Sequence, residues 1–153
     1  MTTTTTTTGQ HQDESQIRDL IAGWEEAMRN RDAERTVTHF AGEPTVFDLA
    51  PPLRQDSAAV TDVAAVRQWF ARFDETFDFE VRDLEVSVGA GVAYAHSLNR
   101  MGTTRDAPEQ FQLWFRATYG LRKLGDEWLI THLHESTPFH MDGSFAAAVD
   151  LEP

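Results

Sequence analysis

Two histidines near the end of the chain have a spacing that suits proton transfer or metal binding. His132 and His134 are two residues apart in an apolar run that alternates like a β-strand, so both side chains share one face. Histidine transfers protons near neutral pH, and a His-x-His pair also suits metal ligation. A metal would need a third ligand, for which His96 and Asp48 are the obvious donors, and no further motif supports one. The pair therefore indicates acid–base chemistry or a structural role, and we expect no metal.

Asp48 is a second candidate because its carboxylate lies in an apolar stretch stiffened by proline. It follows Val46-Phe47 and precedes Leu49-Ala50-Pro51-Pro52. Desolvation in such surroundings disfavours the ionised form and raises the pKa of a carboxyl group toward the range of a useful general base. The alternative is a structural aspartate that accepts hydrogen bonds from backbone amides of its own loop. Both interpretations remain open from the sequence.

The elements that must position these side chains follow from the hydrophobic periodicity. Apolar residues at helical spacing predict an amphipathic helix over residues 14–30, with Trp24 on its inner stripe, where it would pack in the core or line a cavity. Asp13 and Gln16 resemble the capping box of this helix. Asp32 is expected to cap a short second helix whose inner face includes Phe40.

A short strand at Thr45-Val46-Phe47, a third helix and four further strands complete the predicted order. Thr61 or Asp62 is expected to cap the helix, and the apolar period changes to two from Phe77 onward. The apolar parity switches after Val81, which predicts a β-bulge near Arg82-Asp83. Helices followed by antiparallel hairpins predict an α+β fold.

The last hairpin predicts which side chains face the core. A two-residue Gly125-Asp126 turn pairs Leu124 with Glu127 and, by register, Tyr119 with His132 and Ala117 with His134. The face that carries these four side chains is the more apolar one, so we assign it to the core. This register directs both histidines inward and leaves three apolar side chains on the outer face, namely Trp114, Leu129 and Leu133.

Composition limits the partners and the domain organisation. The 153 residues contain 13 Lys and Arg against 25 Asp and Glu, a formal charge of −12, and no cysteine. Such a charge repels nucleic acid and anionic membranes, and neither a signal peptide nor an apolar run of spanning length is present, so we expect a cytoplasmic protein. We predict a disordered threonine-rich leader (residues 1–12), one domain (13–145) and an acidic tail (146–153).

Several stretches together resemble the nuclear-transport-factor-2-like (NTF2-like) superfamily, in particular its SnoaL-like and ketosteroid-isomerase-like members. The resemblance lies in residues 45–53, which include Val46-Phe47-Asp48, in Ala93-Tyr94-Ala95-His96, and in Gly120-Leu121-Arg122-Lys123 before Gly125-Asp126-Glu127-Trp128. It is strongest over residues 131–139, which begin Thr131-His132-Leu133-His134, followed by Met141-Asp142-Gly143.

The resemblance implies a cone formed by a strongly curved antiparallel sheet wrapped around N-terminal helices, with an apolar pocket inside and a homodimer through the outer sheet face. It implies that Asp48 is the base, that His134 with His132 donates or relays protons, and that Tyr119 binds the oxyanion. Three further residues would line the pocket, namely Trp24, Tyr94 and His96. In ketosteroid isomerases a tyrosine of the first helix holds the enolate oxygen, and Trp24 stands at that position here, which argues against steroid isomerisation itself.

The function implied is that of a cofactor-independent acid–base enzyme, an isomerase, cyclase, lyase or hydrolase acting on an apolar carbonyl compound. The alternative is a non-catalytic ligand-binding or assembly domain of the same fold. The His-x-His-x-Ser stretch also resembles the association domain of calmodulin-dependent kinases, which assembles subunits. The sequence leaves these two functions open.

Overall fold

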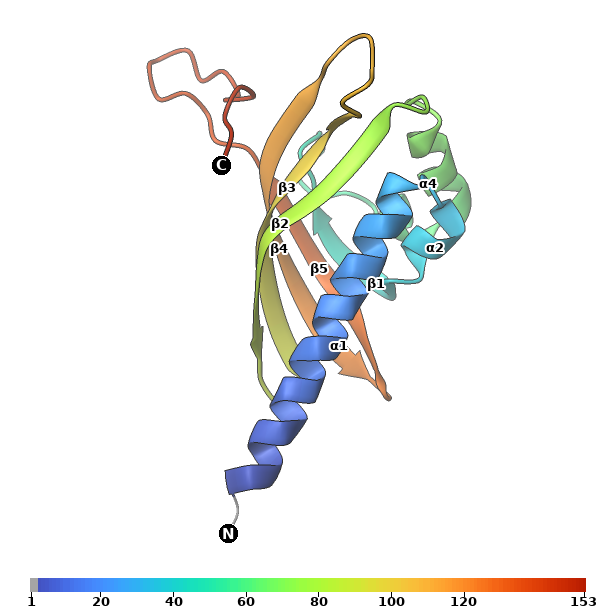
Figure 1. Ribbon diagram of the computed structural model, residues 1–153, viewed down its shortest axis with the longest axis vertical. Helices are drawn as coiled ribbons and strands as arrows, with labels where there is room; N and C mark the ends of the chain where they lie inside the picture. Colours follow the sequence, from blue (N-terminus) through green and yellow to red (C-terminus); the bar gives the residue numbers. More distant parts are fainter. Residues whose placement is uncertain (1–2) are drawn as a thin grey trace.

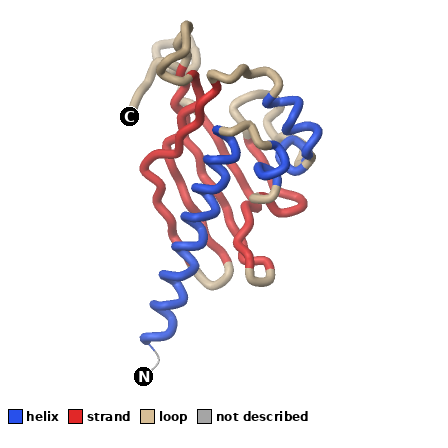
Figure 2. Tube along the Cα trace, turned by 45° about the vertical axis from the view of Figure 1, so that its right-hand side comes forward, coloured by secondary structure: helices blue, strands red, loops and turns tan. Residues whose placement is uncertain are grey.

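A computed structural model describes residues 3–153 of the chain, and its side chains from residue 8 onward. Helices lie against one face of a curved five-stranded sheet, as Figures 1 and 2 show, and together they form an open cone. The helices are α1 (Thr3–Arg29), α2 (Ala33–Val37), α3 (Ala58–Thr61) and α4 (Val63–Phe70). The strands are β1 (Phe40–Phe47), β2 (Phe77–Val88), β3 (Val92–Thr103), β4 (Gln112–Leu124) and β5 (Glu127–Ser136). No helix in this described part is long and apolar enough to cross a membrane.

The sheet has the order β1-β5-β4-β3-β2, and its architecture confirms the predicted α+β cone with one addition. Strands β2 to β5 pair antiparallel in sequence order, whereas β1 pairs parallel with β5, so the sheet is mixed. Strand β1 begins at Phe40, which the sequence had assigned to the second helix. Phe40 is buried against Trp24 in the core, and this tertiary contact outweighs the helical spacing.

The first helix is longer than the sequence predicts. It begins at Thr3, whereas the periodicity predicted a helix only from residue 14, and residues 1–2 of the expected leader lie outside the described part. Once a helix is nucleated and packed, each added residue gains a backbone hydrogen bond at little cost, so the packed segment can extend backwards. Asp13 does not act as a cap: its Oδ1 accepts hydrogen bonds from Lys123 Nζ (2.9 Å) and Trp128 Nε1 (3.0 Å).

Two helix caps follow the prediction. Asp32 Oδ1 accepts the backbone N–H of Arg35 at the start of α2. Asp62 Oδ1 likewise accepts the N–H of Ala64 at the start of α4. These caps satisfy N–H groups that a helix start leaves unpaired, which fixes where each helix begins.

The register of the sheet shifts at three places, one of them between Phe40 and Thr45 of β1, and the sequence predicted one of the other two. The register of β2 against β3 shifts between Arg82 and Glu85, where Asp83 has φ 54°, so the predicted bulge is confirmed. The second shift lies in β5: Leu121 pairs with Ile130, but Gly120 pairs with His132, so Thr131 is an additional residue. A one-residue shift moves every following side chain of a strand to the opposite face.

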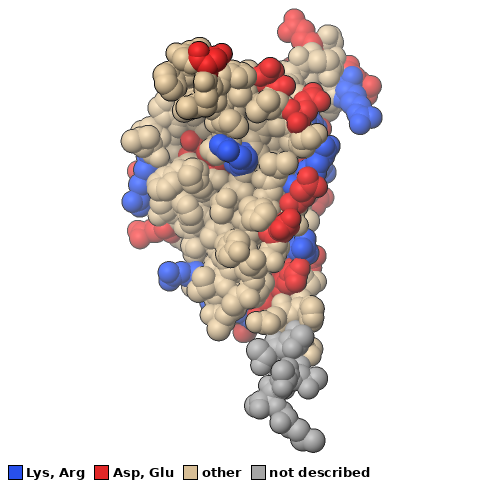
Figure 3. Space-filling view, turned by 90° about the vertical axis from the view of Figure 1, so that its left-hand side faces the viewer, with Lys and Arg blue, Asp and Glu red and all other residues tan. Residues whose placement is uncertain are grey.

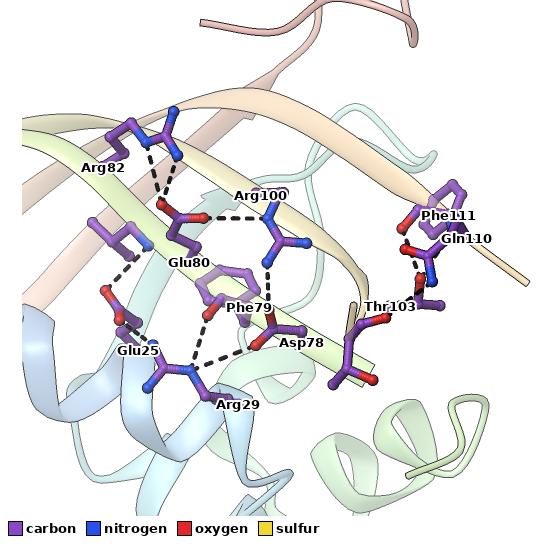
Figure 4. A network of polar contacts seen from close by, with 12 residues as sticks. Glu25, Arg29, Asp78, Phe79, Glu80, Arg82, Arg100, Thr103, Gln110 and Phe111 are labelled. Atoms are coloured by element: carbon purple, nitrogen blue, oxygen red, sulfur yellow. Dashed lines mark hydrogen bonds and ion pairs between the residues drawn. The ribbon is translucent and has the colours of Figure 1, made fainter. Parts of the chain in front are cut away.

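An ionic network fastens α1 to the edge of the sheet, as Figure 4 shows. Glu25 of α1 accepts the backbone N–H of Val81 (3.1 Å) and also pairs with Arg29, whose Nε donates to the carbonyl of Phe79 (3.3 Å). Asp78 of β2 lies 3.6 Å from the same Arg29 Nε. These contacts fix the rotation of α1, and therefore the direction in which Trp24 points into the cone.

Candidate functional site

A cavity of about 420 Å³ lies between the helices and the inner face of the sheet. Most of its lining is apolar, and five of its side chains are aromatic, namely Trp24, Phe40, Trp69, Phe79 and Phe115. Its ionisable side chains are Asp48, Arg72 and Glu135. Ligand sites typically combine an apolar wall with a small number of placed polar groups, so this cavity is the candidate site.

Asp48 and Glu135 form a carboxyl pair at this cavity. Asp48 directly follows β1, and Glu135 lies near the end of β5, next to β1 in the sheet. Burial raises the pKa of Glu135 well above its usual range, and the charge of Asp48 and a hydrogen bond to Asp48 raise this pKa further. Two carboxyl groups in contact cannot both ionise easily, which favours the protonated form of Glu135.

Asp48 also forms the backbone contact that the sequence offered as an alternative. Its Oδ1 accepts the N–H of Leu49 at 2.6 Å. This bond fixes the orientation of the carboxylate without removing the group from the cavity, whose wall includes Asp48. Structural anchoring and placement at the candidate site therefore occur together at this residue.

Trp24 reaches the cavity wall, where the sequence had allowed either core packing or cavity lining. Its side chain is 3% exposed and packs edge-on against Phe79 and Tyr119, and it also lines the cavity. Its indole Nε1 is buried without an acceptor among the described residues. A buried donor that lacks a partner costs free energy, so this N–H is left for an acceptor that the described residues do not supply.

Tyr119 lies on the inner face, as predicted, but its hydroxyl is committed elsewhere. The phenol is completely buried. Its hydroxyl oxygen accepts a hydrogen bond from Asn99 Nδ2 (2.9 Å) and lies 3.1 Å from Ser97 Oγ. Ser97 Oγ in turn donates to Asn99 Oδ1 at 2.7 Å. The three groups form a closed ring of hydrogen bonds, and burial raises the pKa of Tyr119 far above 10. The geometry therefore gives Tyr119 a structural role and does not support the oxyanion role inferred from the resemblance.

The prediction that His132 and His134 point into the cone is wrong. The bulge at Thr131 places them on the outer face of the sheet and turns Leu133 and Glu135 inward. His132 Nδ1 lies 2.7 Å from the carbonyl oxygen of Thr45. The imidazoles of His132 and His134 both pack edge-on against Phe47, so the two side chains of β5 contact β1. Within residues 3–153, no three His, Cys, Asp or Glu side chains gather closely enough to hold a metal ion.

Tyr94 and His96 are also on the outer face, so their expected place in the pocket is wrong. The buried side of β3 is formed by its alternate residues, namely Ala93, Ala95, Ser97 and Asn99. Tyr94 is 56% exposed, and His96 Nε2 lies 3.8 Å from Glu85 of the neighbouring strand. Of the seven predicted site residues, only Asp48 and Trp24 line the cavity.

Glu135 is the site residue that sequence reasoning missed, and a signal for it was present. The apolar residues of β5 change parity after Ile130, because Trp128 and Ile130 are inward and so is Leu133. The same kind of change predicted the bulge in β2. Applied to β5, it would have moved Glu135 from the outer face to the cavity.

A second hollow, of about 530 Å³, lies on the other side of the sheet, where β2, β3 and β4 meet the C-terminal residues. Four of its charged side chains pair with one another: Arg100 with Asp78 and Glu80, and Arg82 with Glu80. Arg82 also covers the ring of Trp114 at 4.5 Å. Because these four groups satisfy each other, they offer little to a ligand.

Comparison with known proteins agrees with this architecture. The model of a SnoaL-like domain matches residues 17–140. An NTF2-like protein of unknown function from Pseudomonas putida KT2440 has 32% identity and a TM-score of 0.82, over 94% of this chain and 98% of that one. A search of curated proteins found no match.

Two more distant solved structures share the fold. A candidate dehydratase of the NTF2-like family from Streptomyces avermitilis has 17% identity and a TM-score of 0.69, over 83% of this chain and 97% of that one. A candidate calcium/calmodulin-dependent protein kinase II association domain from Xanthomonas campestris has 15% identity and a TM-score of 0.60, over 78% and 84% respectively. Their different names show that the fold alone does not decide between catalysis and assembly.

Proposed function

Because the chain belongs to the SnoaL-like domain family of NTF2-like proteins, we propose that it is an acid–base enzyme acting on an apolar carbonyl compound. The observation that supports this most is the Asp48–Glu135 carboxyl pair in an apolar cavity. One carboxyl group that keeps its proton beside another that can accept one forms an acid and a base in contact. The proposed chemistry needs only side chains of the chain itself, without a cofactor.

In the proposed reaction Asp48 is the base and Glu135 is the acid. The Asp48 carboxylate takes a proton from the carbon beside the carbonyl group, and the C–H electron pair becomes the new C=C bond. The carbonyl oxygen receives the proton of Glu135, which gives a neutral enol. In a substrate with a β,γ double bond, Asp48 then gives its proton to the γ-carbon and the enol O–H returns its proton to Glu135, which completes an isomerisation. In a substrate with a β-hydroxyl group, that hydroxyl leaves with the proton of Asp48 as water, the enol O–H returns its proton to Glu135, and the product keeps a double bond between the α- and β-carbons.

Trp24 is the proposed hydrogen-bond donor to the substrate oxygen. Its side chain lines the cavity, and its buried indole N–H has no acceptor among the described residues, so a ligand acceptor would satisfy it without displacing an existing partner. A donor that is fixed before the substrate arrives stabilises charge on oxygen without reorganisation cost. In this proposal Trp24 takes the role that the resemblance had given to Tyr119.

Deuterium exchange tests this proposal before the substrate is known. A panel of enolisable ketones and polyketide-like compounds is incubated with the protein in D2O, and mass spectrometry follows deuterium uptake. We expect Asp48→Asn and Glu135→Gln each to slow uptake by about 10²-fold or more, which is the usual contribution of general acid–base catalysis. The matched control is His134→Gln on the outer face, which should leave uptake unchanged.

Exchange that persists in Asp48→Asn, or disappears in His134→Gln, would contradict the proposal. No uptake with any compound would favour the alternative, a non-catalytic ligand-binding or assembly domain. In that case substitutions in the cavity would change only ligand affinity.

We also propose a homodimer through the outer face of the sheet. Figure 3 views this side of the molecule, where a broad uncharged surface lies beside a border of charged side chains. Tyr94 is 56% exposed there. Analytical ultracentrifugation of the protein and of Tyr94→Asp should show a dimer that the substitution weakens, and a monomer for both would contradict the proposal.

The charge of −12 and the lack of cysteine support a cytoplasmic protein without nucleic-acid or membrane partners.

A further inference from the structure

Arg72 is a cation at the cavity whose charge no described group neutralises. It follows Ala71, the C-cap of α4. Its side chain is exposed, and it is the one basic residue among those that line the cavity. Among residues 3–153, no carboxylate lies within ion-pair distance of its guanidinium. In a chain with 25 acidic and 13 basic residues, an arginine without an acidic partner at an apolar cavity needs an explanation.

Three charged residues near Arg72, namely Asp74, Arg67 and Arg31, are already engaged. Asp74 accepts the backbone N–H of Thr76 at 2.9 Å and bonds to its hydroxyl, which holds its carboxylate in its own turn. Arg67 of α4 pairs with Glu34, and Arg31 donates to the carbonyl of Phe73 at 3.0 Å. Arg72 therefore differs from its neighbours in both respects: it lines the cavity and it lacks a partner.

We propose that Arg72 binds the carboxylate of an aromatic ligand whose ring system occupies the cavity. Five aromatic side chains line the cavity and suit a flat, apolar ring system. A guanidinium matches the two oxygens of a carboxylate with two parallel hydrogen bonds. This inference rests on the proposed function, because it takes the same cavity as the substrate site and narrows the substrate to an aromatic carboxylic acid that also bears a carbonyl group.

The location of Arg72 explains how an acidic protein can take up an anion. The carboxyl pair and the overall charge of −12 both repel an anionic ligand. The guanidinium of Arg72 offsets this repulsion only for ligands whose negative group lies next to it when they are bound. The residue therefore acts as a specificity determinant, orienting the ligand with its carboxylate at Arg72.

The test compares two probes that differ only in charge, 1-naphthaleneacetate and 1-naphthaleneacetamide. Dissociation constants are measured by calorimetry at pH 7.5 and checked by the quenching of tryptophan fluorescence, since Trp24 and Trp69 line the cavity. We expect the acetate to bind about 5–20-fold more tightly than the amide, since a charge-assisted hydrogen bond at an exposed side chain is partly screened. The preference should decrease as salt is added.

Three variants separate the role of Arg72 from a general effect of charge. Arg72→Gln should abolish the preference for the acetate, and Arg72→Lys should retain part of it. The matched control is Arg67→Gln, which removes a cation from the adjacent helix α4 but not from the cavity, and should keep the full preference. A preference that persists in Arg72→Gln, equal binding of the two probes, or no saturable binding of the acetate at millimolar concentration would each overturn the inference.

The binding test and the deuterium-exchange test can contradict the anion site and the catalytic proposal separately. If the acetate preference depends on Arg72 but no compound exchanges deuterium, the anion site stands and the catalytic proposal fails. If exchange depends on Asp48 while the two probes bind equally, the catalytic proposal stands and the anion site fails.

Discussion

Replacing Tyr119 by phenylalanine tests whether its hydroxyl serves the fold or the chemistry. The substitution keeps the ring in its buried place and removes only the oxygen that contacts Asn99 Nδ2 at 2.9 Å and Ser97 Oγ at 3.1 Å. Asn99 is completely buried, so its amide loses its partner without access to water. Ser97 can still donate to Asn99 Oδ1, which limits the damage to one unsatisfied donor.

The expected cost follows from that single unsatisfied group. A buried donor without a partner costs about 1–3 kcal/mol, so we expect Tyr119→Phe to lower the free energy of unfolding by about 2 kcal/mol. At about 2–4 °C per kcal/mol for a domain of this size, Tm should fall by about 4–8 °C.

The assay is thermal and urea unfolding followed by circular dichroism, together with deuterium uptake measured on the folded protein. The matched control is Tyr94→Phe, whose exposed phenol should change stability by less than about 0.5 kcal/mol. Uptake per folded molecule should stay near that of the unsubstituted protein in both variants. A Tyr119→Phe protein with unchanged stability and no exchange would refute this reasoning and return the hydroxyl to the active site.

Three further predictions concern the pH dependence of stability and the register of β5. The pKa of Glu135 is raised in the folded state, so its stabilising contribution is complete below its unfolded pKa and is lost as pH rises through the folded pKa. Glu135→Gln should remove this decline from a curve of Tm against pH. Identical curves for the variant and the unsubstituted protein would contradict this prediction. The pKa of Asp13 is lowered by its hydrogen bonds to Lys123 and Trp128, so its contribution to stability is present above the unfolded pKa and is lost as pH falls through the folded pKa. In urea unfolding, Asp13→Asn should therefore lower the free energy of unfolding by about 1–2 kcal/mol at pH 7 and leave it unchanged below the folded pKa. Deleting Thr131 removes the bulge and turns both strand histidines inward, so it should prevent folding or lower Tm by more than 10 °C (about 3 kcal/mol or more), whereas Thr131→Ser should fold normally.

Local signals in the sequence were sufficient for much of the fold. Asp32 and Asp62 cap helices because a side-chain oxygen next to a helix start has only nearby N–H groups to satisfy. The Gly125-Asp126 turn fixed the first pairs of the last hairpin correctly, Leu124 with Glu127 and Leu121 with Ile130. In both cases the determining contacts lie within a few residues of one another.

The candidate site was harder to predict because it depends on contacts between distant residues. A turn fixes the register of a hairpin only as far as the first bulge, and Thr131 separates the correct pairs from the wrong ones. Asp13 has the spacing of a cap, yet its partners Lys123 and Trp128 lie more than 100 residues away. Long-range partners of this kind leave no periodic signal in the sequence.

The most direct measurement of the central claim is the titration of the carboxyl groups by 13C NMR, in the protein and in Glu135→Gln. We expect one glutamate carboxyl that keeps its proton well above the usual glutamate range, and this resonance should be absent from the variant. In Asp48→Asn the same carboxyl should titrate at a lower pH, because one of the causes of its raised pKa is removed. If every glutamate carboxyl titrates in its ordinary range, Asp48 and Glu135 do not share a proton and the proposed acid–base pair is contradicted.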